Sequence, residues 1–197
     1  MPFPPAQSPE LRTEIPGPRS RALAQRLARV ESRNVTCLVP NPPIFWERAA
    51  GVNVWDVDGN RYLDLTAAFG VASAGHSHPR VVEAVARQAG TLLHGMGDVH
   101  PATVKLELLE ALAARFPGGG PARSVLGSSG SDAVEAALKT AILATGRPGV
   151  VAFEGAYHGL SLGSLDVTSR RDFRDPFAAR LAHASVFARF GDVADVL

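Results

Sequence analysis

The stretch that decides the fold reads Val-Leu-Gly-Ser-Ser-Gly-Ser-Asp over residues 125–132 and continues as Ala-Val-Glu-Ala-Ala-Leu-Lys-Thr-Ala over residues 133–141. The apolar pair favours a short buried strand, the five Gly and Ser residues favour a tight turn, and the residues that follow have strong helix propensity. The first N–H groups of a helix lack intrahelical partners and lie at the positive end of its dipole. The stretch therefore predicts a strand, a turn and a helix N-terminus that suits an anion such as phosphate.

Residue types separate the kinds of phosphate site that this turn resembles. A P-loop is excluded because no Gly-Lys-Ser/Thr sequence closes the turn. A dinucleotide fingerprint is excluded because Gly127 and Gly130 do not form Gly-x-Gly-x-x-Gly, and Glu154 is the only acid near the position about 20 residues further on. A phosphate that does not belong to a nucleotide remains. Taken alone, the motif also fits a turn that only caps the helix through Ser131 or Asp132.

A second motif follows the short apolar run at residues 150–153 and reads Glu-Gly-Ala-Tyr-His-Gly over residues 154–159. An aromatic residue just past a strand, with glycines on both sides, can lay its ring over a planar ligand that a neighbouring turn holds. Tyr157 has this position. By itself it also fits a residue of the core or its rim, but its pairing with the turn favours a cofactor platform.

These residues resemble the class III, or omega, aminotransferases, which are pyridoxal 5′-phosphate (PLP) enzymes of fold type I. The resemblance lies in residues 129–139 and 153–159, and in a third block, residues 51–65 with Gly-His-Ser-His-Pro at 75–79, which is similar to the family's N-terminal hairpin and glycine-histidine turn. The blocks keep the family's order over most of residues 40–170. The resemblance implies an α/β fold: an N-terminal arm and hairpin, then the first part of a fold-type I PLP-dependent transferase large domain, incomplete.

The resemblance assigns cofactor-binding roles to four residues. Gly130 and Ser131 would hold the PLP phosphate through their N–H groups and the Ser131 hydroxyl. Tyr157 would stack on the pyridine ring, and His158 lies in the motif beside that ring. Asp132 stands where the family usually has Glu, and we expect it to cap the helix and orient the loop, because a carboxylate beside a phosphate is otherwise repelled.

The resemblance also implies which catalytic groups are absent from this chain. The chemistry needs a lysine that forms a Schiff base with PLP and a carboxylate that keeps the pyridine nitrogen protonated. Of the two lysines, Lys139 lies in the helix behind the turn and Lys105 in an amphipathic, surface-type helix. In the family, the lysine and the carboxylate come later in the sequence. We therefore expect an N-terminal part of a longer enzyme, without catalytic residues and inactive alone, in which Asp192 begins a further helix.

Phe69 stands where related enzymes place residues that line the substrate entrance. In those dimers this segment often contributes to the active site of the partner subunit. A plain core aromatic is the alternative. The apolar residues at 44–46, with Trp55 and Phe69, would be exposed to solvent if the arm had no partner. A homodimer is therefore expected.

The function that the resemblance implies is PLP-dependent transamination between an omega-amino acid or amine, of the 4-aminobutyrate type, and an oxo acid. An aminomutase or racemase of the same family, or a catalytically inactive fragment, is the alternative.

Composition excludes several other classes. The 197 residues are 46% hydrophobic and 20% charged, with a net charge of +1, which suits a globular protein and not an electrostatic nucleic-acid binder. The arginines near the start alternate with Leu23, Leu27 and Val30 as the polar face of a short helix. The single cysteine, Cys37, is expected to be a small buried residue of a reducing compartment. No signal peptide or transmembrane stretch is evident, so we expect a soluble, cytoplasmic protein.

Metal binding is not expected, although four histidines follow one another closely. They lie in or beside turns, lack the His-x-x-x-His spacing of a helical metal site, and are His76, His78, His94 and His100.

The order of elements follows from periodicity and from Pro and Gly. The expected elements are an extended segment at 1–18, helix 20–32, irregular arm 33–50, hairpin 52–64 around Asp58-Gly59, helices 79–94 and 101–116, loop 117–121, strand 123–127, helix 131–145, strand 149–153 and a helical or mixed tail from 159. The expected parts are an arm and helix (1–50), a hairpin and helix (51–100) and the start of the truncated PLP-binding domain (101–197).

Overall fold

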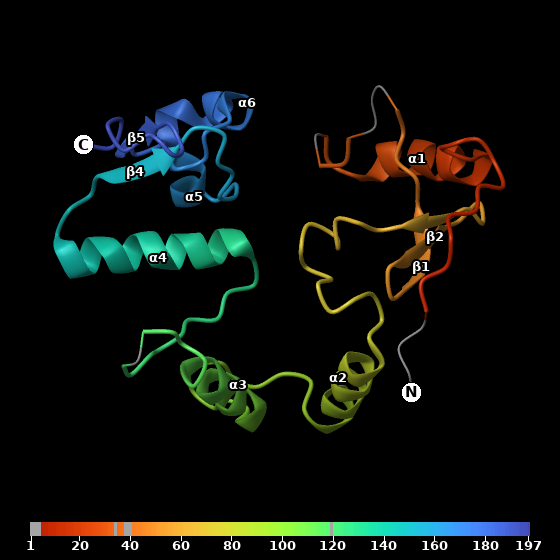
Figure 1. The fold of residues 1–197 in the computed structure, drawn as a ribbon, viewed down its shortest axis with the longest axis horizontal. Coiled ribbons are helices and arrows are strands. Elements are labelled where there is room, and N and C mark those ends of the chain that lie inside the picture. The colour runs from red at the N-terminus through yellow and green to blue at the C-terminus, as the bar shows by residue number, and fades with distance from the viewer. Residues whose placement is uncertain (1–4, 34, 38–40, 119) are drawn as a thin grey trace. The chain divides into compact units, whose positions relative to one another are not determined.

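The computed structural model of the chain forms two compact units, an N-terminal unit of residues 1–102 and a C-terminal unit of residues 103–197. The structure describes residues 5–33, 35–37, 41–118 and 120–197 (Figure 1). Three expected segments, the extended start, the arm and the loop, contain residues that lie outside this described part, namely 1–4, 34, 38–40 and 119.

The first helix, α1 (Pro18–Val30), confirms the helix expected at 20–32 and begins with Pro18 after Gly17. Its opening N–H groups are covered by the hairpin, because the Asp58 carboxylate accepts hydrogen bonds from Arg19 N (2.8 Å) and Ser20 N (2.9 Å). A side chain at Gly17 would collide with this carboxylate. The hairpin therefore caps α1 from a distance in sequence.

An antiparallel sheet in the order β1-β2-β3 is the centre of the N-terminal unit. Strands β2 (Asn53–Asp56) and β3 (Arg61–Leu63) confirm the expected hairpin, and Gly59 has the positive φ, +84°, that its turn requires. Strand β1 (Trp46–Ala50) corrects the irregular arm expected at 33–50. The sequence Trp-Glu-Arg-Ala-Ala has low strand propensity, and pairing with β2 overrides it.

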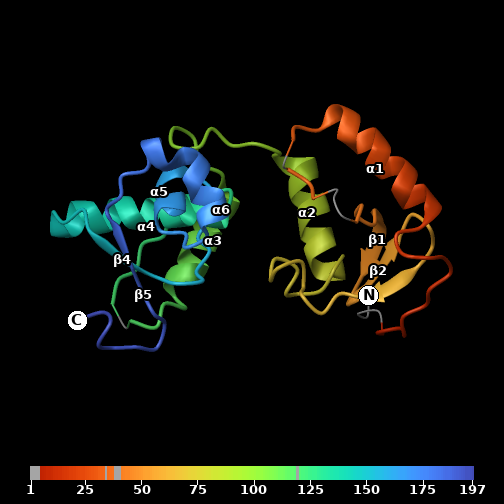
Figure 2. The ribbon, with the colours of Figure 1, turned by 90° about the horizontal axis from the view of Figure 1, so that it is seen from above.

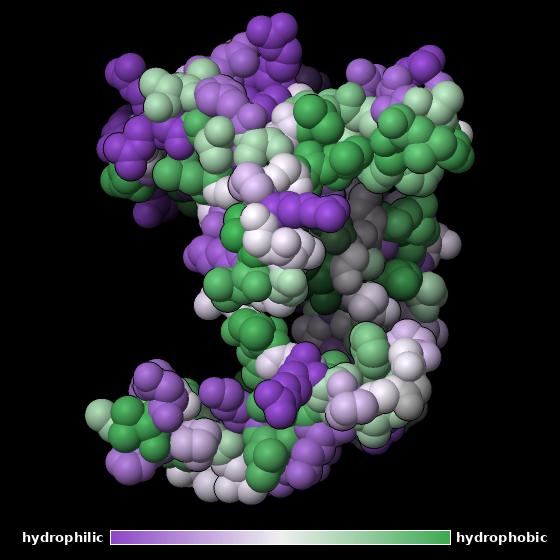
Figure 3. All heavy atoms as spheres, turned by 90° about the vertical axis from the view of Figure 1, so that its left-hand side faces the viewer, coloured by the Kyte–Doolittle hydropathy of each residue, from purple (hydrophilic) through white to green (hydrophobic). Residues whose placement is uncertain are grey.

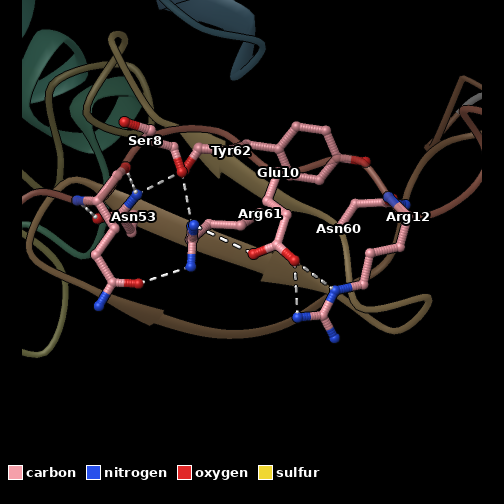
Figure 4. Close-up of polar contacts among 8 residues, drawn as sticks. Ser8, Glu10, Arg12, Asn53, Asn60, Arg61 and Tyr62 are labelled. Atoms are coloured by element: carbon pink, nitrogen blue, oxygen red, sulfur yellow. Dashed lines mark hydrogen bonds and ion pairs between the residues drawn. The ribbon is translucent and has the colours of Figure 1, made fainter.

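The N-terminal segment is fastened to this sheet by polar side chains (Figure 4). Asn53 exchanges hydrogen bonds of 2.7 Å with the backbone of Gln7, and Glu10 forms a backbone bridge and an ion pair with Arg61. Asn60 accepts from the N–H groups of residues 12 and 13. Asn53 and Asn60 are almost completely buried, so their hydrogen bonds are internal to the fold.

Helices α2 (Pro79–Thr91) and α3 (Thr103–Ala113) confirm the helices expected at 79–94 and 101–116, each slightly shorter. Neither helix has a buried residue. Apolar residues accordingly reach the surface in several places, as one face of the molecule illustrates (Figure 3). No helix in the described part of the chain is long and apolar enough to cross a membrane.

The C-terminal unit is built around α4 (Gly130–Thr145), which confirms the helix expected at 131–145 and ends at the left-handed Gly146. Strand β4 (Val150–Phe153), expected at 149–153, pairs in parallel with β5 (Ser185–Ala188). The expected mixed tail consists of the short elements α5 (Leu162–Asp166), α6 (Arg171–Arg174) and η1 (Asp175–Arg180), with β5. Helices α4 and α5 lie side by side (Figure 2), and α5 carries the buried Leu165 and Ser164.

Three expectations about local structure are wrong. Residues 123–127 form no strand, because a strand needs a hydrogen-bonded neighbour and no described segment pairs with them; Val125 is 77% exposed. Asp192 opens no helix and instead accepts from Ala194 N and Asp195 N in a turn. Cys37 is exposed and not buried.

Candidate functional site

The turn before α4 is ordered by two reciprocal caps. The Ser129 hydroxyl accepts a hydrogen bond from Asp132 N (3.1 Å), and the Asp132 carboxylate accepts one from Ser128 N (3.1 Å). Asp132 thus orients the loop, as expected, but the helix is capped by Ser129 and not by Ser131 or Asp132. A Cβ at Gly127 would lie 2.9 Å from the Asp132 Cβ, so the turn requires glycine there.

Two N–H groups at the start of α4 have no hydrogen-bond partner among the described residues. The first hydrogen bond of this helix to the preceding turn runs from Ala133 N to Ser129 O, and the Asp132 N–H is taken by the Ser129 hydroxyl. The N–H groups of Gly130 and Ser131 remain, at the positive end of a 16-residue helix. This is the arrangement that binds phosphate at helix N-termini.

The Ser131 side chain belongs to a cluster of three serines. Its oxygen accepts from Ser161 N (3.2 Å) and lies 2.8 Å from Ser161 Oγ and 2.7 Å from Ser164 Oγ. Ser164 also bonds to the Ser161 carbonyl (3.0 Å). The Ser131 hydroxyl thus joins α4 to the segment before α5, and its donation to a phosphate stays a prediction.

The segment 157–161 forms the second wall of the site. Gly159 has φ +121°, and a Cβ there would lie 2.5 Å from the Ser131 hydroxyl, so only glycine fits. His158 donates its N–H to Thr168 Oγ1 (3.0 Å), a fully buried side chain. Tyr157 is 54% exposed, and its ring packs edge-to-face with that of Phe173, the two ring centroids being 5.9 Å apart. Backbone fit to α4 therefore fixes where Tyr157 and His158 lie.

These two walls border a wide-open pocket of about 680 Å³. All four predicted cofactor residues line it, and they are joined by five residues that sequence reasoning did not assign to the site, namely Ser129, Val134, Gly159, Leu160 and Ser161. Ser129 and Gly159 lie inside the quoted motifs, so a stricter reading of those motifs would have found them. Val134 and Leu160 carry no chemical group that would mark them.

The remaining candidate residues lie elsewhere. Phe69 belongs to the N-terminal unit, where it is 99% exposed, so the core-aromatic alternative is wrong. Lys105 on α3 and Lys139 on α4 are exposed, and neither lines the pocket. Among the described residues, no group of three His, Cys, Asp or Glu side chains could hold a metal ion. His76 instead contacts the Asp64 carboxylate at 2.7 Å.

Comparison with known proteins defines the class. Residues 36–192 match the model of the class-III aminotransferase family, so the chain belongs to that family. It is 41% identical over 190 residues to the 4-aminobutyrate aminotransferase of Mycobacterium tuberculosis (strain CDC 1551 / Oshkosh), covering 94% of this chain and 42% of that protein. It is 44% identical over 128 residues to the 5-aminovalerate aminotransferase DavT of Pseudomonas aeruginosa, covering 65% and 30%. The chain thus spans less than half the length of these curated relatives.

Solved structures show the same fold. The ornithine aminotransferase of Toxoplasma gondii ME49 matches 90% of this chain and 42% of its own, with a TM-score of 0.77 and 24% identity. The taurine:2-oxoglutarate aminotransferase of Bifidobacterium kashiwanohense, in complex with PLP and glutamate, matches 90% and 38%, with a TM-score of 0.75 and 23% identity. The expected fold, part of a fold-type I transaminase, is confirmed.

Proposed function

We propose that this chain supplies the phosphate-binding and ring-stacking part of a PLP-dependent aminotransferase, which transfers an amino group between an omega-amino acid or amine and an oxo acid. The observation that carries the proposal is the pair of N–H groups of Gly130 and Ser131, without partners in the described chain, at a pocket that Tyr157 also lines. The 4-aminobutyrate and 5-aminovalerate aminotransferases among the relatives support this substrate class.

The residues of the pocket fit PLP. The N–H groups of Gly130 and Ser131 would take the phosphate, and the half-exposed ring of Tyr157 is available to stack on the pyridine. The Asp132 carboxylate accepts a hydrogen bond from Ser128 N, and Asp132 does not line the pocket. The pocket volume, about 680 Å³, lies within the range of small-molecule sites.

PLP, when bound, supplies an electron sink for bond cleavage at the carbon that carries the amino group. The residues of this chain would anchor the phosphate of the group and orient its ring. No lysine lines the pocket. We assign the Schiff-base lysine and the carboxylate at the pyridine nitrogen to parts of the enzyme outside this chain, and we expect the chain alone to show no transamination above the rate of free cofactor.

An aminomutase or racemase would use the same anchor for PLP. The family description and the printed functions of the relatives, which are aminotransferases, favour transamination.

Calorimetric titration of the chain with pyridoxamine 5′-phosphate tests the site, because this form of the cofactor has no aldehyde to react with surface lysines. Pyridoxamine without phosphate is the control ligand and is expected to bind much more weakly, since each charge-assisted hydrogen bond contributes about 1.5–3 kcal/mol. Ser131→Ala and Tyr157→Ala are each expected to raise the dissociation constant. Equal binding of both ligands, or unchanged constants in both variants, would contradict the assignment.

We further propose that the enzyme is a cytoplasmic homodimer in which the partner covers the segment around Phe69. This segment exposes 99% of Phe69, 87% of Leu65 and 88% of Val71, an apolar surface of the kind that subunit contacts cover. Light scattering and binding of a hydrophobic dye test the proposal. A monomer that binds no dye would count against it.

A further inference from the structure

The carboxylate of Glu135 lies one turn behind the phosphate-binding end of α4 and is engaged by the element that follows the pocket. Its Oε1 accepts a hydrogen bond of 2.8 Å from Ser164 N, in the first turn of α5. Ser164 is completely buried. A carboxylate at the start of a helix takes up N–H groups that have no intrahelical acceptor, so Glu135 closes the start of α5 from the neighbouring helix.

A glycine lies where α5 approaches this carboxylate. A Cβ at Gly163 would lie 2.7 Å from Glu135 Oε1 and 2.9 Å from Oε2, so a larger residue there would displace the end of the Glu135 side chain. A Cβ at Gly159 would likewise lie 2.5 Å from the Ser131 hydroxyl oxygen. Two glycines of one segment thus face two side chains of α4, spaced four residues apart on one helix face.

From Ser164 the hydrogen bonds lead to the pocket. Ser164 Oγ bonds to Ser131 Oγ (2.7 Å) and to the Ser161 carbonyl (3.0 Å). The Ser164 carbonyl accepts from Thr168 Oγ1 (2.9 Å), and that hydroxyl in turn accepts from His158 N (3.0 Å). The residue next to Tyr157 is therefore held by a chain of contacts that begins at Glu135.

We propose that Glu135 is a positioning residue for cofactor binding: it holds α5, and through it the segment 157–161, against α4, so that Tyr157 lies over the ring of a ligand whose phosphate is bound by Gly130 and Ser131. This inference rests on the proposed function. It adds that Glu135 affects ring stacking more than phosphate binding, because the phosphate-binding N–H groups of Gly130 and Ser131 belong to the backbone of α4 itself.

The test compares Glu135→Ala with Glu135→Gln, which keeps an acceptor oxygen in the same place, and with Glu110→Ala, an exposed glutamate of α3, as the matched control. Each form of the 197-residue chain is titrated with pyridoxamine 5′-phosphate and with inorganic phosphate. We expect Glu135→Ala to weaken pyridoxamine 5′-phosphate roughly tenfold or more, as the loss of one hydrogen bond to a charged group implies. Its affinity for inorganic phosphate should change less than about threefold, and Glu135→Gln and Glu110→Ala should resemble the parent chain.

Amide hydrogen exchange without any ligand separates this inference from the proposed function. If Glu135 holds the second wall, Glu135→Ala speeds exchange at the N–H groups of Ser161 and Ser164, and Glu135→Gln does not. A parent chain that binds neither ligand would overturn the proposed function, while the exchange rates still decide the role of Glu135. Unchanged exchange in Glu135→Ala, or an equal loss of affinity for both ligands, would overturn the positioning role.

Discussion

Helices α1 and α4 both start at a glycine-containing turn, but their first N–H groups differ in whether they have hydrogen-bond acceptors. At α1, the carboxylate of Asp58 reaches across from the hairpin and takes the N–H groups of Arg19 and Ser20. At α4, the local cap takes only the N–H group of Asp132 and leaves those of Gly130 and Ser131 without described partners. A helix start that the fold itself closes is structural, whereas one that the fold leaves open at a pocket is suited to an anion.

The largest effect on stability is expected from replacing Asp56, whose carboxylate holds the turn that carries Asp58. Asp56 is completely buried, and its carboxylate accepts from Asp58 N, Asn60 N, the Asn60 amide and the Tyr62 hydroxyl. Asp56→Ala leaves several of these buried donors unpaired, which should lower the free energy of unfolding by roughly 3–5 kcal/mol.

Denaturant unfolding followed by tryptophan fluorescence measures this loss, because both tryptophans, Trp46 and Trp55, lie in the N-terminal unit. Asp98→Ala, at an exposed carboxylate of the same unit, is the control and should change little. A loss below 1 kcal/mol for Asp56→Ala would mean that the network is not structural.

The second prediction concerns the segment 157–161, which forms the second wall of the site at the start of α4. Gly159→Ala combines a φ of +121° with a Cβ 2.5 Å from the Ser131 hydroxyl. Strain and overlap together should cost roughly 2–4 kcal/mol and abolish binding of pyridoxamine 5′-phosphate. Gly155→Ala is the matched control, since its φ of +79° is also positive but no heavy atom lies within 4 Å of the added Cβ. If both variants behaved alike, backbone strain and not the contact with Ser131 would explain the requirement for glycine.

The third prediction opens the closed helix start directly. Asp58→Ala removes the acceptor for two N–H groups of α1 and should cost roughly 1–2 kcal/mol, as for other lost helix caps. Asp58→Asn keeps one acceptor oxygen and should lose less. Calorimetric titration of both variants with inorganic phosphate sharpens the comparison, because the start of α1, unlike that of α4, does not line the candidate pocket. Phosphate binding gained in Asp58→Ala would show that an open N-terminus alone suffices.

The sequence predicted the open helix start well because its determinants are local. Ser129, Gly130 and Asp132 act within four residues of one another, and propensity and capping rules apply directly. The closed start was missed, since Asp58 lies about 40 residues from the N–H groups that it takes. Distance in sequence also hid strand β1, whose pairing with β2 overrides a poor strand composition, and the contact of Glu135 with Ser164, 29 residues away.

The strand predicted at residues 123–127 was wrong for the opposite reason. Their composition, with Val125 and Leu126, satisfies the local preferences of a buried strand, but strand structure depends on a neighbour, and none of the described strands pairs with them. Local rules therefore predicted the helix N-terminus and the turn, and could not predict the partners that close, cover or extend them.

The smallest expected effect is the response of the N-terminal unit to acid. In the N-terminal unit, the contact with His76, followed by hydrogen bonds from Thr66, lowers the pKa of Asp64 to about 2. Burial alone would raise the pKa of Asp58, but hydrogen bonds from Ser20 and Arg19 outweigh it and hold that pKa below its ordinary value. Both carboxylates thus have a lower pKa in the folded chain than the value of about 3.9 in an unfolded one.

A group with a depressed pKa in the folded state stabilises the fold above its unfolded pKa, and this contribution is lost as the pH falls through the folded pKa. The N-terminal unit should therefore keep its full contribution from Asp64 above about pH 4 and lose it progressively as the pH falls toward the folded pKa of about 2. The thermal midpoint, read from the fluorescence of Trp46 and Trp55 between pH 5 and pH 2, measures the loss. Asp64→Asn should flatten the dependence, because the amide does not titrate. If the thermal midpoint of that variant fell with pH as steeply as in the parent chain, other carboxylates would govern the acid response. Asp58, the carboxylate that caps α1, would then be the next residue to replace by its amide.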